Sequence, residues 1–172
     1  MEAVARQAGV STKTVYRLFP DKAGLFEAMV TDRIDRFASA FSLRSCEGKD
    51  IEALLVKALL ICAELVLNEE VVALQRTMLA ESDRFPEIAE MFYSKAMRRT
   101  IAVLAEWLRA QAMRGLIEVD DAEIAAGMLL GMLAYQPQRA AMFGHQALPT
   151  GDELERHAQA CAALFLRGCR RR

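Results

Sequence analysis

Hydroxyl-bearing and basic side chains gather in one short stretch near the start of the chain. The stretch reads AGVSTKTVYRLFPDK and covers residues 8–22. Hydroxyl groups and cations can bond to phosphate oxygens and to the edges of bases, which is the chemistry of nucleic-acid recognition. The residues that could make such contacts are Ser11, Thr12, Lys13, Thr14, Tyr16, Arg17 and Lys22.

The residues around this stretch have the spacing of a helix-turn-helix. Ala5 is small and lies in the middle of a first short helix, and Gly9 follows where a tight turn needs a positive φ. Val15 lies where a second helix must pack back on the first. Ser11 is a suitable N-cap for that second helix, because its hydroxyl can accept a bond from a free backbone N–H. The alternative is that these polar residues are the solvated faces of two packed helices.

Charge favours DNA binding only locally. The 172-residue chain has a net charge of −1, so it has no overall attraction for a polyanion. From Arg6 to Lys22, however, four basic residues accompany a single acidic one. Any binding to nucleic acid must therefore come from this local basic patch.

Apolar residues recur at helical spacing along nearly the whole chain, and no convincing strand pattern occurs. Hydrophobic residues make up 53% of the sequence, which is enough for a substantial core. The pattern predicts an all-α protein. In the helix expected at about residues 86–114, Met97 falls in register with Leu104 and Leu108 on the core face. We expect helices at about residues 1–8, 12–18, 22–44, 50–68, 70–83, 86–114, 121–143 and 152–168.

The last two expected helices carry more apolar surface than one core needs. Residues 124–134 read IAAGMLLGMLA and are apolar on every side, so this helix must be covered all round. The last helix has a second apolar face beside its core stripe. These faces favour a homodimeric helical bundle over a fully monomeric core. The candidate interface residues are Gly127, Gly131, Tyr135, Cys161 and Phe165.

Residues 4–30, VARQAGVSTKTVYRLFPDKAGLFEAMV, closely resemble the DNA-binding segment of the TetR family of bacterial transcriptional regulators. The match includes the AGVS turn, Thr14, Tyr16, Phe19 and Lys22. It implies that Thr12, Lys13, Thr14 and Arg17 face the major groove or its edges. It also implies that Tyr16 and Lys22 hold phosphates, Lys22 from a helix start where backbone N–H groups favour an anion.

The rest of the chain is similar to the ligand-binding body of the same family, notably over residues 74–93 and 115–133. The resemblance implies a helix-turn-helix domain with a linking helix over residues 1–44 and a ligand-binding and dimerisation domain over residues 45–172. It implies a homodimeric repressor on a palindromic double-stranded operator, released by a small, mainly apolar effector that shifts the linking helix. Candidate effector contacts are Met78, Tyr93, Trp107 and Met128, with ordinary core packing as the alternative for each.

Members of the family have one more helix ahead of the helix-turn-helix. We expect this chain to lack it, because Met1 falls where the second helix of the family's fold begins. Without that cover, Val4, Val15 and Leu18 would lose part of their packing. An alternative function is therefore a dimeric helical ligand-binding or interaction module that does not bind DNA, because its helix-turn-helix domain is incomplete.

Other residue types indicate no further chemistry. Neither histidine has a partner at metal-ligand spacing, and no nucleophile or phosphate-loop motif occurs, so we expect neither an enzyme nor a cofactor. The four cysteines, Cys46, Cys62, Cys161 and Cys169, form no CxxC pair, and Cys62 and Cys161 fall in apolar helical positions typical of buried thiols. No signal peptide or membrane span is indicated, so we expect a cytoplasmic protein.

Overall fold

The computed structural model describes residues 1–44 and 48–169, and within these ranges it contains helices and no strand. The predicted all-α class is confirmed. One π-helical turn, η1, interrupts a helix that was expected to be continuous. The elements are α1 (Glu2–Gln7), α2 (Thr12–Leu18), α3 (Lys22–Arg44), α4 (Ile51–Val66), α5 (Glu69–Glu81), α6 (Pro86–Phe92), η1 (Tyr93–Met97), α7 (Arg98–Met113), α8 (Ala122–Met142) and α9 (Gly151–Cys169).

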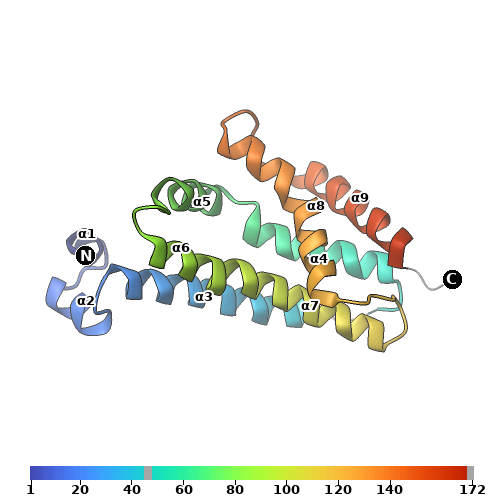
Figure 1. Ribbon diagram of the computed structural model, residues 1–172, viewed down its shortest axis with the longest axis horizontal. Helices are drawn as coiled ribbons and strands as arrows, with labels where there is room; N and C mark the ends of the chain where they lie inside the picture. The colour runs from blue at the N-terminus through green and yellow to red at the C-terminus, as the bar shows by residue number, and fades with distance from the viewer. Residues whose placement is uncertain (45–47, 170–172) are drawn as a thin grey trace.

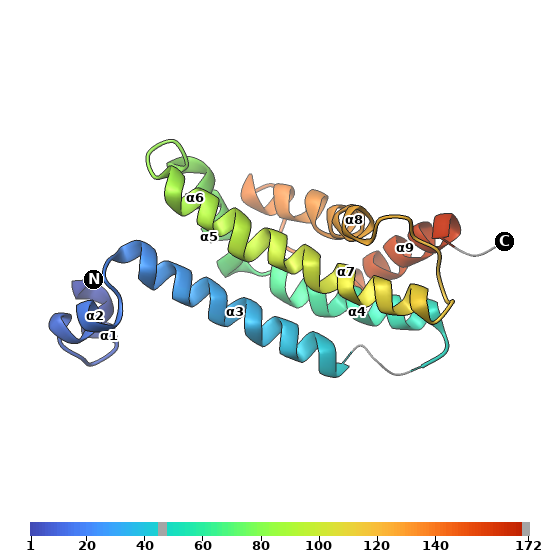
Figure 2. The same cartoon turned by 60° about the horizontal axis from the view of Figure 1, so that its bottom comes forward.

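The helices form an elongated bundle with α1 and α2 at one end (Figure 1). Helix α4 packs against α3, α5, α7, α8 and α9. Along one side of the bundle, α3 lies beside the long helix made of α6, η1 and α7 (Figure 2), and both run in the same direction. Helices α8 and α9 pack on each other and on α4, on the other side of the molecule (Figure 1).

The main core forms around α4, as its apolar stripe predicts. Leu55 and Leu59 on this helix are fully buried, and they belong to one cluster with side chains of α3, α7, α8 and α9. The expected stripe on α3 is also buried, with Phe37 and Phe41 in this cluster. The largest fully buried side chains are Leu55, Leu59, Leu104, Leu108, Leu129, Leu133 and Leu166.

Short polar residues set where the helices begin. Asp50 accepts bonds from two backbone N–H groups of the first turn of α4, and Asp121 does the same for α8. Asn68 caps α5 through Val71 N–H. Such caps satisfy donors that the first turn of a helix leaves without partners. Pro86 opens α6, as predicted, because its missing N–H costs nothing there.

A second, smaller apolar cluster lies nearer to α1 and α2. Val30 and Ile34 of α3 are buried there with Phe92 of α6, and the partly buried side chains Phe26, Leu65, Leu74, Met78 and Ala96 pack around them. The rings of Phe26 and Phe92 stack with their centroids 6.3 Å apart. This second cluster joins α3 to α5, α6 and the end of α4.

The expectation that Met97 faces the core is wrong. At η1 the backbone N–H of Arg98 bonds to the carbonyl of Tyr93, five residues back, instead of four. The wide turn inserts one extra residue and rotates the residues on either side of it relative to each other. Met97 is therefore 46% exposed, while Leu104 and Leu108 are buried as predicted.

The core assignment predicts a contrast between two positions of α7. Leu108→Ala should lower the free energy of unfolding by about 2–5 kcal/mol, because it leaves a cavity in the main core. Met113→Ala, at a side chain that is 84% exposed, should change it by less than about 0.5 kcal/mol. Urea titration followed by circular dichroism measures both, and equal losses for the two variants would contradict the placement of the core.

Candidate nucleic-acid interface

The turn between α1 and α2 is built as its sequence predicts. Gly9 has a φ of 68°, in the left-handed region that favours glycine. Its N–H bonds to the carbonyl of Arg6, and the N–H of Val10 bonds to that of Ala5. These two bonds close the end of α1 and turn the chain toward α2. Only glycine reaches this conformation without a penalty from Cβ.

Helix α2 packs on α1 through the residues that the spacing singled out. Ala5 and Val15 are buried between the two helices. Ser11 is the N-cap: its Oγ accepts a bond from Thr14 N–H at 3.1 Å and lies 2.8 Å from Thr14 Oγ1. The predicted cap is confirmed, and the Thr14 hydroxyl is tied to it.

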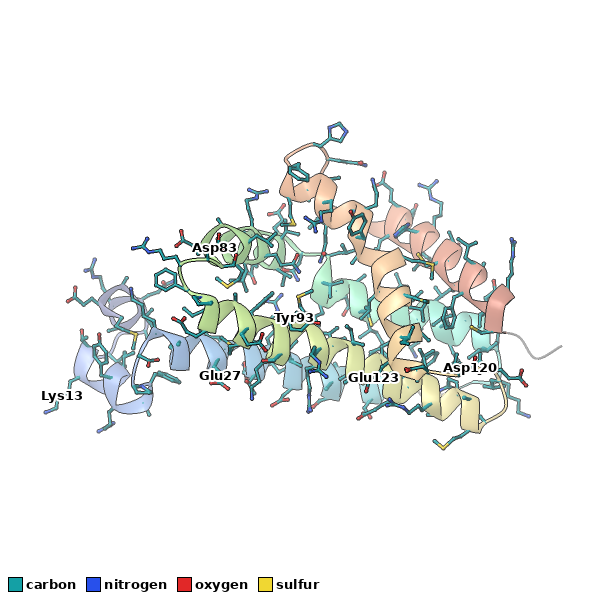
Figure 3. The ribbon with its side chains drawn as sticks, in the orientation of Figure 1. Lys13, Glu27, Asp83, Tyr93, Asp120 and Glu123 are labelled. Carbon is teal, nitrogen blue, oxygen red and sulfur yellow. The ribbon has the colours of Figure 1, made fainter. Side chains whose placement is uncertain are left out.

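The outer face of α2 is basic. Each helical residue turns by about 100°, so Lys13 and Arg17, two residues on either side of Val15, point almost directly away from it. Both are exposed, and Figure 3 shows Lys13 at the extreme end of the molecule. Tyr16 is also exposed, while Thr12 and Thr14 are half-buried. The structure therefore brings the predicted contact residues together on one short helix.

Lys22 lies at the first residue of α3, close behind α2 in the chain. The Oδ1 atom of Asp21 accepts a bond from Gly24 N–H at 2.8 Å and so caps this helix. Lys22 is exposed beside the cap. A helix start presents backbone N–H groups and the positive end of the helix dipole, which together favour an anion. The carboxylate of Asp21 opposes this, because it already occupies one of the N–H groups.

Apolar side chains are also exposed on α1 and α2. Leu18 is 64% exposed, and Val4 and Val10 are exposed as well. Val15, in contrast, is buried against α1, so its expected loss of packing is not seen. The contact between α1 and α2 is enough to cover Val15, whereas Val4 and Leu18 point away from that contact.

The four candidate effector residues do not come together. Trp107 is buried in the main cluster, and Met78 packs on the second cluster. Tyr93 is exposed on η1, and Met128 is exposed on α8. Periodicity could not separate these cases, because all four positions are apolar in the sequence.

Several apolar residues of α8 and α9 are exposed, and we call this set of residues the α8–α9 face. On α8 it follows the helical spacing of Ile124, Met128, Gly131 and Tyr135, and on α9 it includes Leu164. Met128 is 63% exposed and Tyr135 66%. Ile124 and Leu164 were not named as interface candidates, and Met128 was named only as a candidate effector contact. The spacing of Ile124 and Met128 from Gly131 and Tyr135 indicates that they share one side of α8.

The remaining candidate interface residues lie elsewhere. Gly127 is half-buried at the edge of the α8–α9 face. Cys161 is buried inside the chain, and Phe165 is half-buried against the main cluster. Both belong to the stripe of α9 that faces α4 and α8, and this stripe is the inner of the two apolar faces on that helix.

A proline in α8 determines one contact between the last two helices. Pro137 has no N–H, so the carbonyl of Leu133, four residues earlier, has no donor from its own helix. The Nε2 atom of His157 on α9 lies 3.0 Å from that oxygen and donates to it. His157 therefore holds α9 in register against α8, which is a structural role.

The three cysteines that the structure describes carry no sign of activation. Burial raises the pKa of Cys62 to about 12 and also raises the pKa values of Cys161 and Cys169. A raised pKa keeps a thiol protonated and unreactive at neutral pH. Cys62 and Cys161 are buried, as predicted, and Cys46 lies outside the described residues.

Within residues 1–44 and 48–169, no three His, Cys, Asp or Glu side chains gather closely enough to hold a metal ion. None of the helices in these ranges combines the length and the apolar character that a bilayer crossing requires.

Two family descriptions match the chain, one for each part. Residues 1–29 match the family of bacterial regulatory proteins named after TetR, and residues 53–169 match the C-terminal domain of AefR-like transcriptional repressors. The first match covers α1, α2 and the start of α3, and the second covers the bundle.

Individual proteins agree with these matches. A Mesorhizobium loti MAFF303099 protein assigned to the TetR family is 33% identical, with a TM-score of 0.86 over 99% of this chain and 86% of its own. The flavonoid-responsive regulator FrrA is 27% identical, with a TM-score of 0.75 over 100% of this chain and 87% of its own.

An uncharacterized HTH-type transcriptional regulator of Mycobacterium bovis is 30% identical over 131 residues, or 74% of this chain. The match spans 63% of that relative's length. The helix-turn-helix at one end, the helical bundle behind it and the matches to both parts lead to one assignment: the chain belongs to the TetR family of transcriptional regulators.

Proposed function

We propose that this chain is a DNA-binding repressor that acts as a homodimer and is released by a small, mainly apolar effector. The observation that carries the proposal is the basic outer face of α2, with Lys13 and Arg17 opposite the buried Val15. A short helix that is anchored on one side and basic on the other can enter a major groove. The match to AefR-like repressors supports the repressor role.

The contacts to DNA divide into two kinds. We propose that Lys13 and Arg17 reach base edges or the groove rim from the outer face of α2, with Thr14 at the side of that face and Thr12 at the first residue of the helix. We propose that Tyr16 and Lys22 hold phosphates, with Ser11 at the start of α2. Contacts of the second kind fix the position of the protein and carry no sequence information.

We further propose that the α8–α9 face is the dimer interface. It is apolar, and its glycine at position 131 would let a second backbone approach closely. Two-fold pairing would bury the same side chains of both copies against each other, with Met128, Tyr135 and Leu164 among them. A dimer of this kind would place two α2 helices on successive major grooves, about 34–36 Å apart, of a palindromic operator.

The second cluster is our candidate for the effector site. It is lined by aliphatic and aromatic side chains and by Met78, whose flexible side chain can adapt to a ligand. Val30 and Ile34 of this cluster belong to α3, which directly follows the helix-turn-helix formed by α1 and α2. We call that helix-turn-helix the head. An effector there would contact the linking helix directly. The likeness to a regulator that is named flavonoid-responsive supports a largely apolar effector.

The two proposed domains follow one another along the chain. Residues 1–44 would form the DNA-binding domain with its linking helix, and residues 45–172 the ligand-binding and dimerisation domain. The two family matches fall on either side of this boundary, at residues 1–29 and 53–169. Helix α3 would then belong to the first domain by sequence and to the second by much of its packing, because Phe37 and Phe41 lie in the main core.

DNA binding is tested with the protein expressed from its complete reading frame and with duplexes that cover the DNA upstream of its own gene. Lys22→Ala and Tyr16→Ala should weaken binding to every duplex, and Lys22→Ala should lower the slope of log affinity against log salt by about 1. Lys13→Ala should instead relax preference at one base pair, by about 1–3 kcal/mol. Fluorescence anisotropy at several salt concentrations measures all three.

Lys57→Ala, at an exposed position of α4, is the matched control and should bind like the unchanged protein. Absence of any salt-dependent binding by the unchanged protein would overturn the regulator proposal. It would favour the alternative, a helical ligand-binding or interaction module. Uniform weakening by Lys13→Ala would contradict its role at a base edge.

The dimer is tested with one buried charge. Met128→Asp should raise the dissociation constant of the dimer roughly 100-fold, because two-fold symmetry brings two like charges into an apolar interface. Met29→Asp is the control, since this methionine is similarly exposed on α3, on the other side of the bundle. Sedimentation velocity over a concentration series measures both, and equal effects would place the interface elsewhere.

A further inference from the structure

The π turn η1 lies where the long helix meets the half of α3 that leads to the head. Its defining bond joins Arg98 N–H to Tyr93 O. Helix η1 packs against α3, and so do the helical segments on both sides of it. Figure 3 shows Tyr93 on this helix and Glu27 on α3 beside it. Single π turns within α-helices are rare and are found frequently at functional sites.

The burial pattern shows that η1 shifts the helix by one residue. The buried series of α7 runs through Gln111, Trp107, Leu104 and Thr100 in steps of four and three. Continued backward in α-helical steps, this series reaches Met97 and then Tyr93. Yet Met97 is 46% exposed and Tyr93 is 52% exposed, while Phe92 is only 8% exposed.

The inward position is therefore held by Phe92, where an uninterrupted α-helix would place Tyr93. The residues before η1 are rotated by about 100°, the angle of one helical residue, relative to the α7 series. Both candidates for the inward position are aromatic rings of similar size. One helix thus carries two adjacent side chains that can each fill the same place beside α3.

The ring stack and the ion pair that join α6 and η1 to α3 lie in the first half of α3, while Phe92 also packs with Ile34 just beyond the middle of that helix. Phe92 stacks on Phe26, and Lys95 Nζ lies 3.5 Å from Glu27 Oε1. Both pairs depend on the segment before or within η1. Beyond η1, Arg99 lies 4.0 Å from Asp35, and this pair does not depend on the rotation of α6. A change of register would break contacts near the head and leave those nearer the main core in place.

We propose that η1 is a one-residue register switch between two states of the long helix. In the π state, Phe92 faces the second cluster and holds the start of α3. In the α state, η1 closes into ordinary α-helical bonds, α6 rotates by about one residue, and Tyr93 replaces Phe92. The rotation breaks the stack on Phe26 and the pair between Lys95 and Glu27.

The switch connects the second cluster to the head. Because Phe92 lines that cluster, a ligand bound among Val30, Ile34 and Met78 favours whichever register leaves room for it. The start of α3 carries Lys22 and leads directly from α2, so its release changes the placement of the basic face. This consequence for DNA rests on the proposed function, whereas the two registers themselves do not.

Fluorine NMR of the full chain labelled with fluorotyrosine tests the switch directly, because the chain has only three tyrosines. Tyr93 should show an exposed signal and, by saturation transfer, a second signal protected from a soluble paramagnetic agent. Phe92→Ala opens room in the second cluster and should make the protected signal the major one. Tyr16 on α2 and Tyr135 on α8 lie outside η1, and signals that match those of the unchanged protein show that the variant is folded.

Deletion of Ser94 should have the opposite effect to Phe92→Ala, because it should keep Phe92 facing inward. In the unchanged chain Phe92 and Thr100 are eight positions apart, or about 800° of α-helix, which is about 80° beyond two turns. Deletion reduces this to about 700°, within 20° of two turns, so both residues face inward without a π turn. The deleted chain should keep only the exposed Tyr93 signal. Ser94→Ala keeps the chain length and should behave like the unchanged protein.

An exposed Tyr93 in folded Phe92→Ala, or a protected signal that persists after the deletion of Ser94, would overturn the switch. The DNA consequence is measured separately by anisotropy with the duplex from upstream of its own gene. Phe92→Ala should bind it at least about tenfold more weakly than the deletion variant. If the unchanged protein does not bind that duplex, the proposed function fails, while the NMR result still decides the switch.

Discussion

The packing of α3 along α6, η1 and α7 is the contact on which the rest of this molecule depends. Helix α3 begins at Lys22, beside the basic face of α2, and its later half supplies Phe37 and Phe41 to the main core. A helix transmits a shift along its axis because its hydrogen bonds keep it stiff over many residues. Along the chain, α1 and α2 are joined to the bundle through the start of α3.

The contact between α3 and the long helix combines a buried apolar cluster with exposed ion pairs, and the two contribute unequally. The second cluster buries Val30, Ile34 and Phe92, and this apolar burial supplies most of the stabilisation. The ion pairs from Lys95 and Arg99 to α3 are exposed, and pairs of this kind contribute little free energy. They fix the register of the two parallel helices more than they hold them together. The apolar cluster is also the smaller of the two cores.

The helices at the two ends of the protein are stabilised in different ways. Helices α1 and α2 are short and are stabilised by local devices: the left-handed Gly9, the Ser11 cap and the contact between Ala5 and Val15. Helices α8 and α9 are long and bury one face each in the bundle, with His157 donating to the carbonyl that Pro137 leaves free. The exposed side of α8 carries Ile124, Met128 and Tyr135, and α9 exposes Leu164 among polar residues.

The sequence alone determined the features that depend on neighbours in the chain. The turn at Gly9, the cap at Ser11, the start at Pro86 and the stripe of α4 were predictable, because each rests on local backbone chemistry or on helical spacing. Only the tertiary structure decided which apolar side chains face the core. Met97 and Tyr93 fit the periodicity of a buried face, but the π turn rotates them outward and Phe92 inward. Met128 is exposed and its neighbour Leu129 is buried for a similar reason, since an all-round apolar helix does not reveal which side its neighbours cover.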